Sequence, residues 1–189
     1  MKQVFALVFA FLMSASAHAG FMIEPYLGYR SGNLENTDLS NVSKKDKYTS
    51  PVLGARVGWS FLGLWTGLDY EMGVGGKSKP ETGASRDVDT SITYLSVGYN
   101  FPVMFRAWVG YGVMADLDAD QSGSKSTLTD GAPLKVGFGY TGLPLVSINF
   151  EYLMWEPETI ESGGSSIKVS DSYSKYEFNA MMLSVSIPL

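Results

Sequence analysis

Eight segments of this sequence alternate apolar and polar residues with a period of two, and this alternation constrains the fold more than any other feature. The segments are rich in Tyr, Phe, Val and Trp, and stretches rich in Gly, Ser, Asp, Lys and Pro separate them. We predict an all-β chain with eight strands, over Phe21–Ser31, Pro51–Phe61, Leu64–Gly73, Ser91–Phe101, Met104–Ala115, Pro133–Thr141, Leu145–Trp155 and Lys175–Leu189.

The connections between these strands alternate between long and short. Long loops are expected at Gly32–Ser50, Val74–Thr90, Asp116–Ala132 and Glu156–Ser174, and tight turns at Leu62-Gly63, Pro102-Val103 and Gly142-Leu143-Pro144. An even number of strands with short turns at one end and longer loops at the other is typical of bacterial outer-membrane barrels. The sequence therefore predicts an eight-stranded antiparallel up-and-down transmembrane β-barrel.

The two faces of the predicted strands differ in polarity. Successive side chains of a strand point to opposite faces, so the parity of a position assigns it to the lipid or to the lumen. In the second strand the apolar face carries Leu53, Ala55, Val57, Trp59 and Phe61, and Arg56 lies on the other face. In the fifth strand the lumen face is predicted to carry Arg106, Trp108, Gly110, Gly112 and Met114.

The charged residues on the lumen faces form a balanced set. They are Glu24, Arg30, Arg56, Asp69, Glu71, Arg106, Lys135 and Glu151, four basic and four acidic. An isolated buried ion costs several kcal/mol, so charges inside a membrane barrel must be paired or hydrated. We predict an interior ionic network, with lumen glycines leaving room for long side chains. The alternative is a soluble barrel of the lipocalin type, with an apolar interior and a hydrated surface.

Aromatic residues concentrate near the ends of the predicted strands, which indicates two interfacial girdles. The expected members are Trp59, Phe61, Tyr99, Phe101 and Phe105 beside the turns, and Tyr29, Tyr70, Tyr152 and Trp155 beside the loops. Ordinary strand propensity is the alternative cause of this distribution.

The N-terminus has the pattern of a secretory signal peptide. Lys2 precedes the apolar run Val4–Met13, and Ala17-His18-Ala19 is a small-residue cleavage site. The run is about ten residues long, and a membrane-spanning helix needs about twenty. We therefore expect a signal peptide at residues 1–19 and an outer-membrane barrel domain at residues 20–189, with an uncleaved signal-anchor as the alternative.

The composition of the chain removes several classes of function. The sequence has no cysteine, and its only histidine, His18, lies in the predicted signal peptide. Imidazole bases, thiol nucleophiles and the usual zinc or copper sites are thus excluded, so we expect no catalytic residues, no metal and no cofactor. A net charge of −5 argues against a nucleic-acid partner.

Two charged segments of the expected loops are candidate ion or phosphate sites. Asp116–Gly123 has carboxylates at alternate positions, but Gln121 and Thr127 stand where a calcium loop needs Gly and Glu. A solvated acidic loop is the expectation. Lys44, Lys45 and Lys47 form a basic run that could meet lipid phosphates, and a solvated loop is the alternative.

The last strand and two Gly-aromatic segments carry a family resemblance. Met181, Leu183, Val185, Ile187 and Leu189 share one parity, and this pattern resembles the assembly signal of outer-membrane barrels, although the usual final Phe is replaced by Leu189. With Leu95–Phe101 and Lys135–Tyr140, the chain resembles the OmpA/OmpX-type transmembrane barrel superfamily. The resemblance implies contact with outer-membrane lipid, lipopolysaccharide and the barrel-assembly machinery, and no peptidoglycan-binding domain is expected.

The expected function is a structural or surface-interaction role for a barrel whose polar interior is largely filled, because eight strands enclose little more than their own side chains. One alternative is a narrow channel or carrier for small or apolar solutes. Another is an adhesin that acts through the four outer loops. We expect a monomer without enzymatic activity.

Overall fold

The computed structural model describes residues 20–80, 84–121 and 124–189. The predicted signal peptide therefore lies outside the described residues. Among the described residues, no helix has the length and apolar character needed to span a bilayer.

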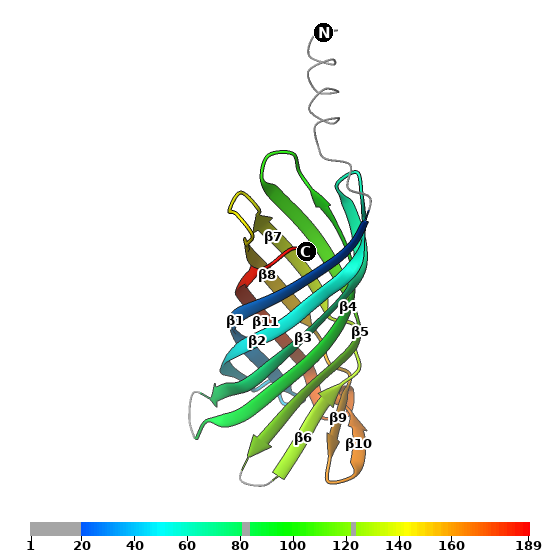
Figure 1. The fold of residues 1–189 in the computed structure, drawn as a ribbon. Coiled ribbons are helices and arrows are strands. Elements are labelled where there is room, and N and C mark those ends of the chain that lie inside the picture. Colours follow the sequence, from blue (N-terminus) through cyan, green and yellow to red (C-terminus); the bar gives the residue numbers. More distant parts are fainter. Residues whose placement is uncertain (1–19, 81–83, 122–123) are drawn as a thin grey trace.

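Eight strands close into an antiparallel barrel, as predicted (Figure 1). In order around the barrel they are β1 (Gly20–Asp38), β2 (Ser43–Phe61), β3 (Leu64–Pro80), β4 (Arg86–Asn100), β5 (Phe105–Gln121), β7 (Leu134–Tyr140), β8 (Ser147–Trp155) and β11 (Tyr173–Ser186). The pairing of β5 with β7 closes the ring, and the pairing of β1 with β11 joins the first strand to the last.

The two ends of the barrel are built differently. Short connections follow β2, β4 and β7 at one end, which we call the turn end, and the C-terminal residues lie there too: the Leu189 N–H donates to Ile23 O over 2.9 Å. At the other end, which we call the hairpin end, the sheet continues into β6 (Ser124–Thr129), β9 (Thr159–Ser162) and β10 (Ser165–Lys168), with a short 3-10 helix, η1 (Val169–Asp171).

Most of the expected long loops are strand. The first of them, predicted over Gly32–Ser50, is reduced to the connection Leu39–Val42, because β1 and β2 remain paired as far as Thr37 and Ser43. Within the expected acidic loop, Asp116–Gln121 likewise forms the outer part of β5 and pairs with β6. The prediction was wrong because it required a continuous apolar face, which a strand loses once it leaves the lipid.

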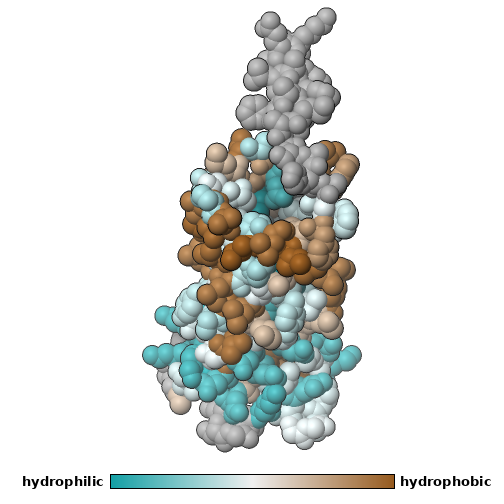
Figure 2. Space-filling model, viewed as in Figure 1, coloured by the Kyte–Doolittle hydropathy of each residue, from teal (hydrophilic) through white to brown (hydrophobic). Residues whose placement is uncertain are grey.

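An apolar belt surrounds the turn-end half of the barrel. In β2 the outward-facing Leu53, Val57, Trp59 and Phe61 are all exposed. Ten residue steps separate Phe61 from Pro51, and a strand tilted by about 40° covers roughly 25 Å of the barrel axis over that length, which matches the thickness of a membrane belt. Figure 2 shows this band, with hydrophilic residues gathered at the hairpin end.

The aromatic residues at the belt edges follow the prediction in part: six are exposed, Tyr99 and Tyr152 are half-buried, and one faces the interior. Trp59, Phe61, Phe101 and Phe105 are exposed near the turn end, and Tyr29 and Tyr70 are exposed on the other side of the belt. Trp155 was placed in the girdle, but its side chain is 2% exposed and faces the interior. The odd positions of β8, Trp155 included, are buried and line the lumen. The Trp155 indole N–H donates to Asp130 O over 2.9 Å.

The polarity of the wall reverses along the barrel axis. Within the belt the outside is apolar and the inside is charged. Toward the hairpin end the inside holds a buried apolar cluster, which we call the plug, formed by Leu34, Tyr48, Val88, Ile92, Tyr94, Ala115, Leu117, Leu128, Leu153, Trp155, Phe178 and Ala180. The outward neighbours of the plug residues Val88 and Leu117 are charged: Asp87 and Asp89 in β4, and Asp116 and Asp118 in β5. The hairpin end is therefore organised like a water-soluble β-protein, with apolar residues inside and charges outside.

A β-bulge changes which residues of β5 face the interior. Tyr94 of β4 pairs with Gly112, whereas the preceding Thr93 pairs with Met114, so Val113 is an extra residue. Met114 was predicted to face the lumen, but the bulge turns it outward and it is 64% exposed. The same shift turns Leu117 inward, where it joins the plug.

Lumen glycines sit against large inward side chains, in accordance with their predicted role. A Cβ atom built on Gly137 would lie 2.1 Å from the Trp108 ring, and one built on Gly54 would lie 2.2 Å from the Tyr26 ring. These positions have no room for any side chain, so glycine there sets how closely an aromatic ring can lie against the wall.

Candidate functional site

The eight charged residues predicted for the lumen lie together in the middle of the barrel. Six strands supply them: β1, β2, β3, β5, β7 and β8. Every one of these side chains is at most 3% exposed. Strand register aligns part of the set directly, since Arg56 is paired with Glu24 on one side and with Asp69 on the other.

Arg56 is the centre of the network. Its guanidinium nitrogens lie 3.2 Å from Glu24 Oε1, 3.1 Å from Asp69 Oδ2 and 2.8 Å from Glu151 Oε1. The rings of Tyr26 and Trp108 cover the guanidinium, with centroids 4.5 and 4.6 Å from Cζ. One cation thus holds three carboxylates from three strands, in a site that its aromatic neighbours keep away from water.

Arg106 forms the part of the network nearest the turn end. It binds Glu24 with two nitrogens, one of them 2.6 Å from Oε2. The same guanidinium donates to Asn149 Oδ1 over 2.6 Å and to Ser186 Oγ over 3.1 Å. Polar residues of β8 and β11 therefore complete its shell.

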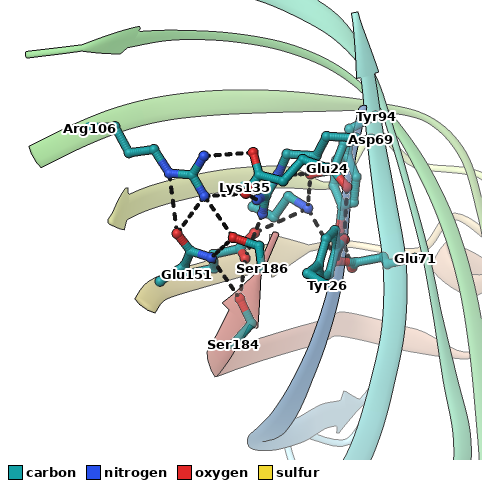
Figure 3. A network of polar contacts seen from close by, with 12 residues as sticks. Glu24, Tyr26, Asp69, Glu71, Tyr94, Arg106, Lys135, Glu151, Ser184 and Ser186 are labelled. Atoms are coloured by element: carbon teal, nitrogen blue, oxygen red, sulfur yellow. Dashed lines mark hydrogen bonds and ion pairs between the residues drawn. The ribbon is translucent and has the colours of Figure 1, made fainter. Parts of the chain in front are cut away.

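Lys135, Arg30, Tyr26 and Tyr94 form the part of the network that includes the plug residue Tyr94. Figure 3 labels Lys135 and the two tyrosines. The Lys135 ammonium lies 2.6 Å from Asp69, 3.1 Å from Glu71 and 3.3 Å from Glu151. Arg30 forms an ion pair with Glu71. The Tyr26 hydroxyl donates to Asp69 over 2.7 Å, and the Tyr94 hydroxyl donates to Glu71 over 2.8 Å.

The network is electrically balanced, and each of its carboxylates binds at least two partners. Four cations face four anions, so no charge is left over in the low-dielectric lumen. Among the described residues there is no group of three or more acidic side chains placed to hold a metal ion.

Sequence reasoning missed the neutral members of the network. These are Tyr26, Tyr94, Asn149, Ser184 and Ser186, which donate to or accept from the charged groups. All five lie on lumen-facing positions of their strands, so parity was the signal that could have found them.

The lumen is open toward the network from the turn end. A cavity of about 680 Å³ lies there, and it reaches Glu24 and Arg106 past Met22 and Asn100. From the other side, the plug covers the network. The interior is therefore open at the turn end and closed at the hairpin end, and the ionic network forms the bottom of the open cavity.

The C-terminal residues proposed as an assembly signal lie on the outside of the belt. Met181, Leu183, Val185, Ile187 and Leu189 are each at least 46% exposed. Beyond β11 the tail stays paired with β1, because the Ile187 N–H donates to Pro25 O over 3.0 Å. Their role in assembly stays a prediction.

Comparison with known proteins places the fold among outer-membrane barrels. A family model described as "Outer membrane protein beta-barrel domain" matches residues 4–186. Neisserial surface protein A is 16% identical, with 89% of this chain and 97% of that chain covered and a TM-score of 0.52. OprG from Pseudomonas aeruginosa is 11% identical, with 92% and 98% covered and a TM-score of 0.50. No curated protein sequence matches the chain.

Proposed function

The chain belongs to the outer membrane protein β-barrel domain family and lies in the outer membrane, and from this premise we propose that it is a structural or surface-interaction barrel that does not conduct solutes. One observation carries the proposal. The ionic network occupies the middle of the lumen, and the plug occupies the part toward the hairpin end.

Planar-bilayer recording tests the filled lumen. We expect no reproducible unitary conductance from the purified protein, because an ion would have to displace both the network and the plug. Unboiled gel migration of the same sample must first show that the barrel is folded. Reproducible current steps would contradict the proposal and favour the narrow channel or carrier. That alternative has support from the turn-end cavity of about 680 Å³, which reaches Glu24 and Arg106.

The proposal places the hairpin end at the cell surface. Outer-membrane barrels have short periplasmic turns and longer extracellular connections, and the hairpin end carries β6, β9 and β10 beyond the belt. A projection of this kind suits contact with surfaces or other molecules, and it also supports the adhesin alternative.

Deletion of β9 and β10 tests the adhesin alternative. If the protein is an adhesin, this deletion should weaken surface binding without changing gel migration.

Single cysteines can test this orientation, since the chain has none of its own. With Ser166→Cys on β10, a membrane-impermeant maleimide should label intact cells. With Leu143→Cys in a turn-end connection, labelling should need lysed cells. Both positions are exposed, so accessibility within the fold does not separate them. The opposite labelling pattern would reverse the proposed orientation.

The proposal further includes partners and the absence of catalysis. We propose outer-membrane lipid, lipopolysaccharide and the assembly machinery as partners of a monomer. The outward-facing C-terminal residues continue the apolar belt, which supports outer-membrane lipid and the assembly machinery as partners. The binding of every network carboxylate to cations or hydroxyls supports a barrel without enzymatic activity.

A further inference from the structure

Four lysines lie on the outer face of β2 and β3 just beyond the apolar belt. They are Lys45, Lys47, Lys77 and Lys79, and all four are exposed. We call this set the lysine patch. Only part of it was visible in the sequence, because Lys77 and Lys79 come from a different strand than the run Lys44, Lys45 and Lys47.

Two of the four lysines face each other directly. Lys47 and Lys79 are direct register partners across β2 and β3. Lys45 forms an ion pair with Glu35, and Lys77 forms one with Asp87. Within the described part of the chain no carboxylate forms an ion pair with Lys47 or Lys79. Like charges directly opposite each other destabilise a sheet, so this arrangement weakens the hairpin unless an anion lies between them.

The strands next to the patch carry the opposite charge. On the outer face of the next two strands, β4 and β5, the charges are acidic. Asp87 lies opposite Asp120 in the strand register, and Asp89 lies opposite Asp118. An anion near the hairpin end is therefore attracted to the lysine patch and repelled by the neighbouring strands. A groove of about 340 Å³ lies in the patch, lined by Lys45, Lys47, Lys79 and Pro80.

The height of the patch corresponds to the lipid headgroups. Lys47 lies four residues beyond Pro51, where the apolar face of β2 ends. Four residues of a tilted strand cover about 10 Å of the barrel axis. The headgroup layer extends for roughly 5–8 Å beyond the hydrocarbon, and a lysine can bend its charged end back toward it.

We propose that Lys47 and Lys79 together bind a phosphate group of a lipid headgroup in the leaflet around the hairpin end. Two ammonium groups on opposed strand positions donate charge-assisted hydrogen bonds to one phosphate, which removes their mutual repulsion. With the hairpin end outward, that leaflet contains lipopolysaccharide, whose lipid A part carries phosphate. The inference uses the proposed orientation but does not depend on whether the lumen conducts.

Binding of lipid A to the purified protein in a neutral, phosphate-free detergent tests this site. The variant is Lys47→Gln with Lys79→Gln, and the matched control is Lys125→Gln with Lys168→Gln, which removes the same charge from β6 and β10. We expect bisphosphorylated lipid A to bind the patch variant at least tenfold more weakly, and the control within about twofold of the unaltered protein. Equal loss in both variants, or no loss in the patch variant, would overturn the proposal.

Two further binding measurements distinguish the lipid phosphate from the acyl chains and from free phosphate as the bound group. Dephosphorylated lipid A should bind the unaltered protein and the patch variant equally weakly, and tight binding to both would assign recognition to the acyl chains. Inorganic phosphate should compete only at far higher concentration than lipid A, and equal potency would assign the site to free phosphate instead.

The repulsion between the two lysines can be measured without any lipid. In lipid-free detergent the patch variant should unfold at a higher urea concentration than the unaltered protein, because the like charges at positions 47 and 79 are gone. A lower midpoint would show that Lys47 and Lys79 do not oppose each other, and it would overturn the proposal.

Discussion

Replacing Arg56 with methionine is expected to lower the free energy of unfolding by about 3–5 kcal/mol, as is usual when one partner of a buried ion pair is removed. Arg56 is fully buried and contacts Glu24, Asp69 and Glu151. Without it, four carboxylates share three cations, and the position of the lost guanidinium is fully buried. Urea unfolding of the barrel in detergent, followed by unboiled gel migration, measures the change.

Restoring the charge balance should recover part of this loss. In Arg56→Met with Glu151→Gln, three cations face three anions, so the double variant should be more stable than Arg56→Met alone. A surface control is Lys125→Met, since Lys125 is exposed and lies 3.2 Å from Asp118. It should cost less than about 1 kcal/mol. An Arg56→Met barrel as stable as this control would show that the network is hydrated rather than buried.

Replacing Phe178 with alanine in a separate variant is expected to cost about 3–5 kcal/mol, as deletion of a buried aromatic side chain usually does. Phe178 is fully buried in the plug. The Tyr48 ring meets it edge-on at 5.0 Å, and the Trp155 ring lies 6.4 Å away. Phe178 packs among apolar side chains inside the barrel, so the hydrophobic effect stabilises this cluster as it does the core of a soluble protein.

Phe150→Ala is the matched control for the plug. Phe150 lies on β8 within the belt, faces outward and is 48% exposed. Lipid or detergent can fill the space that its ring leaves, so the free energy of unfolding should fall less than for Phe178→Ala. Hydrogen exchange should also rise at the hairpin end in Phe178→Ala and stay unchanged there in Phe150→Ala. Equal effects in the two variants would show that the plug does not pack as a core.

The lumen side of the candidate site could be predicted because parity in a strand is a rigid rule. Arg56 lies between the apolar residues Ala55 and Val57. Because lipid covers the face that carries Ala55 and Val57, the Arg56 guanidinium must point to the opposite face, into the lumen. The same reasoning placed Lys135 and Arg106. Which charged side chains contact each other could not be predicted, because contacts across the lumen depend on the register between strands. Register is a property of two paired strands, so the sequence of one strand does not determine it.

The plug was missed although the sequence contains a signal for it. In Asp87-Val88-Asp89 and in Asp116-Leu117-Asp118 an apolar residue alternates with charges. This is the pattern of a strand with a buried inner face and a hydrated outer face. The assumption that every strand has an apolar outer face along its whole length instead predicts loops in these segments, because their outer face is charged. The bulge at Val113 has no comparable sequence signal, and it accounts for the wrong face assigned to Met114.

The reversal of polarity along the axis determines what a given substitution does. A lysine is accommodated on the outer face at position 47, whereas a lysine at the outward-facing Val57, inside the belt, would cost about 2–4 kcal/mol. The reverse holds in the lumen, where an apolar residue suits position 178 and not position 56. Contributions from the two halves cancel in chain-wide averages, which is how a protein embedded in lipid can have a mean hydropathy of only +0.03. The effect of a substitution in this chain therefore depends on two things together: whether the side chain faces outward or into the lumen, and how far it lies from the bilayer centre. Knowing only one of the two does not predict whether the substitution is tolerated.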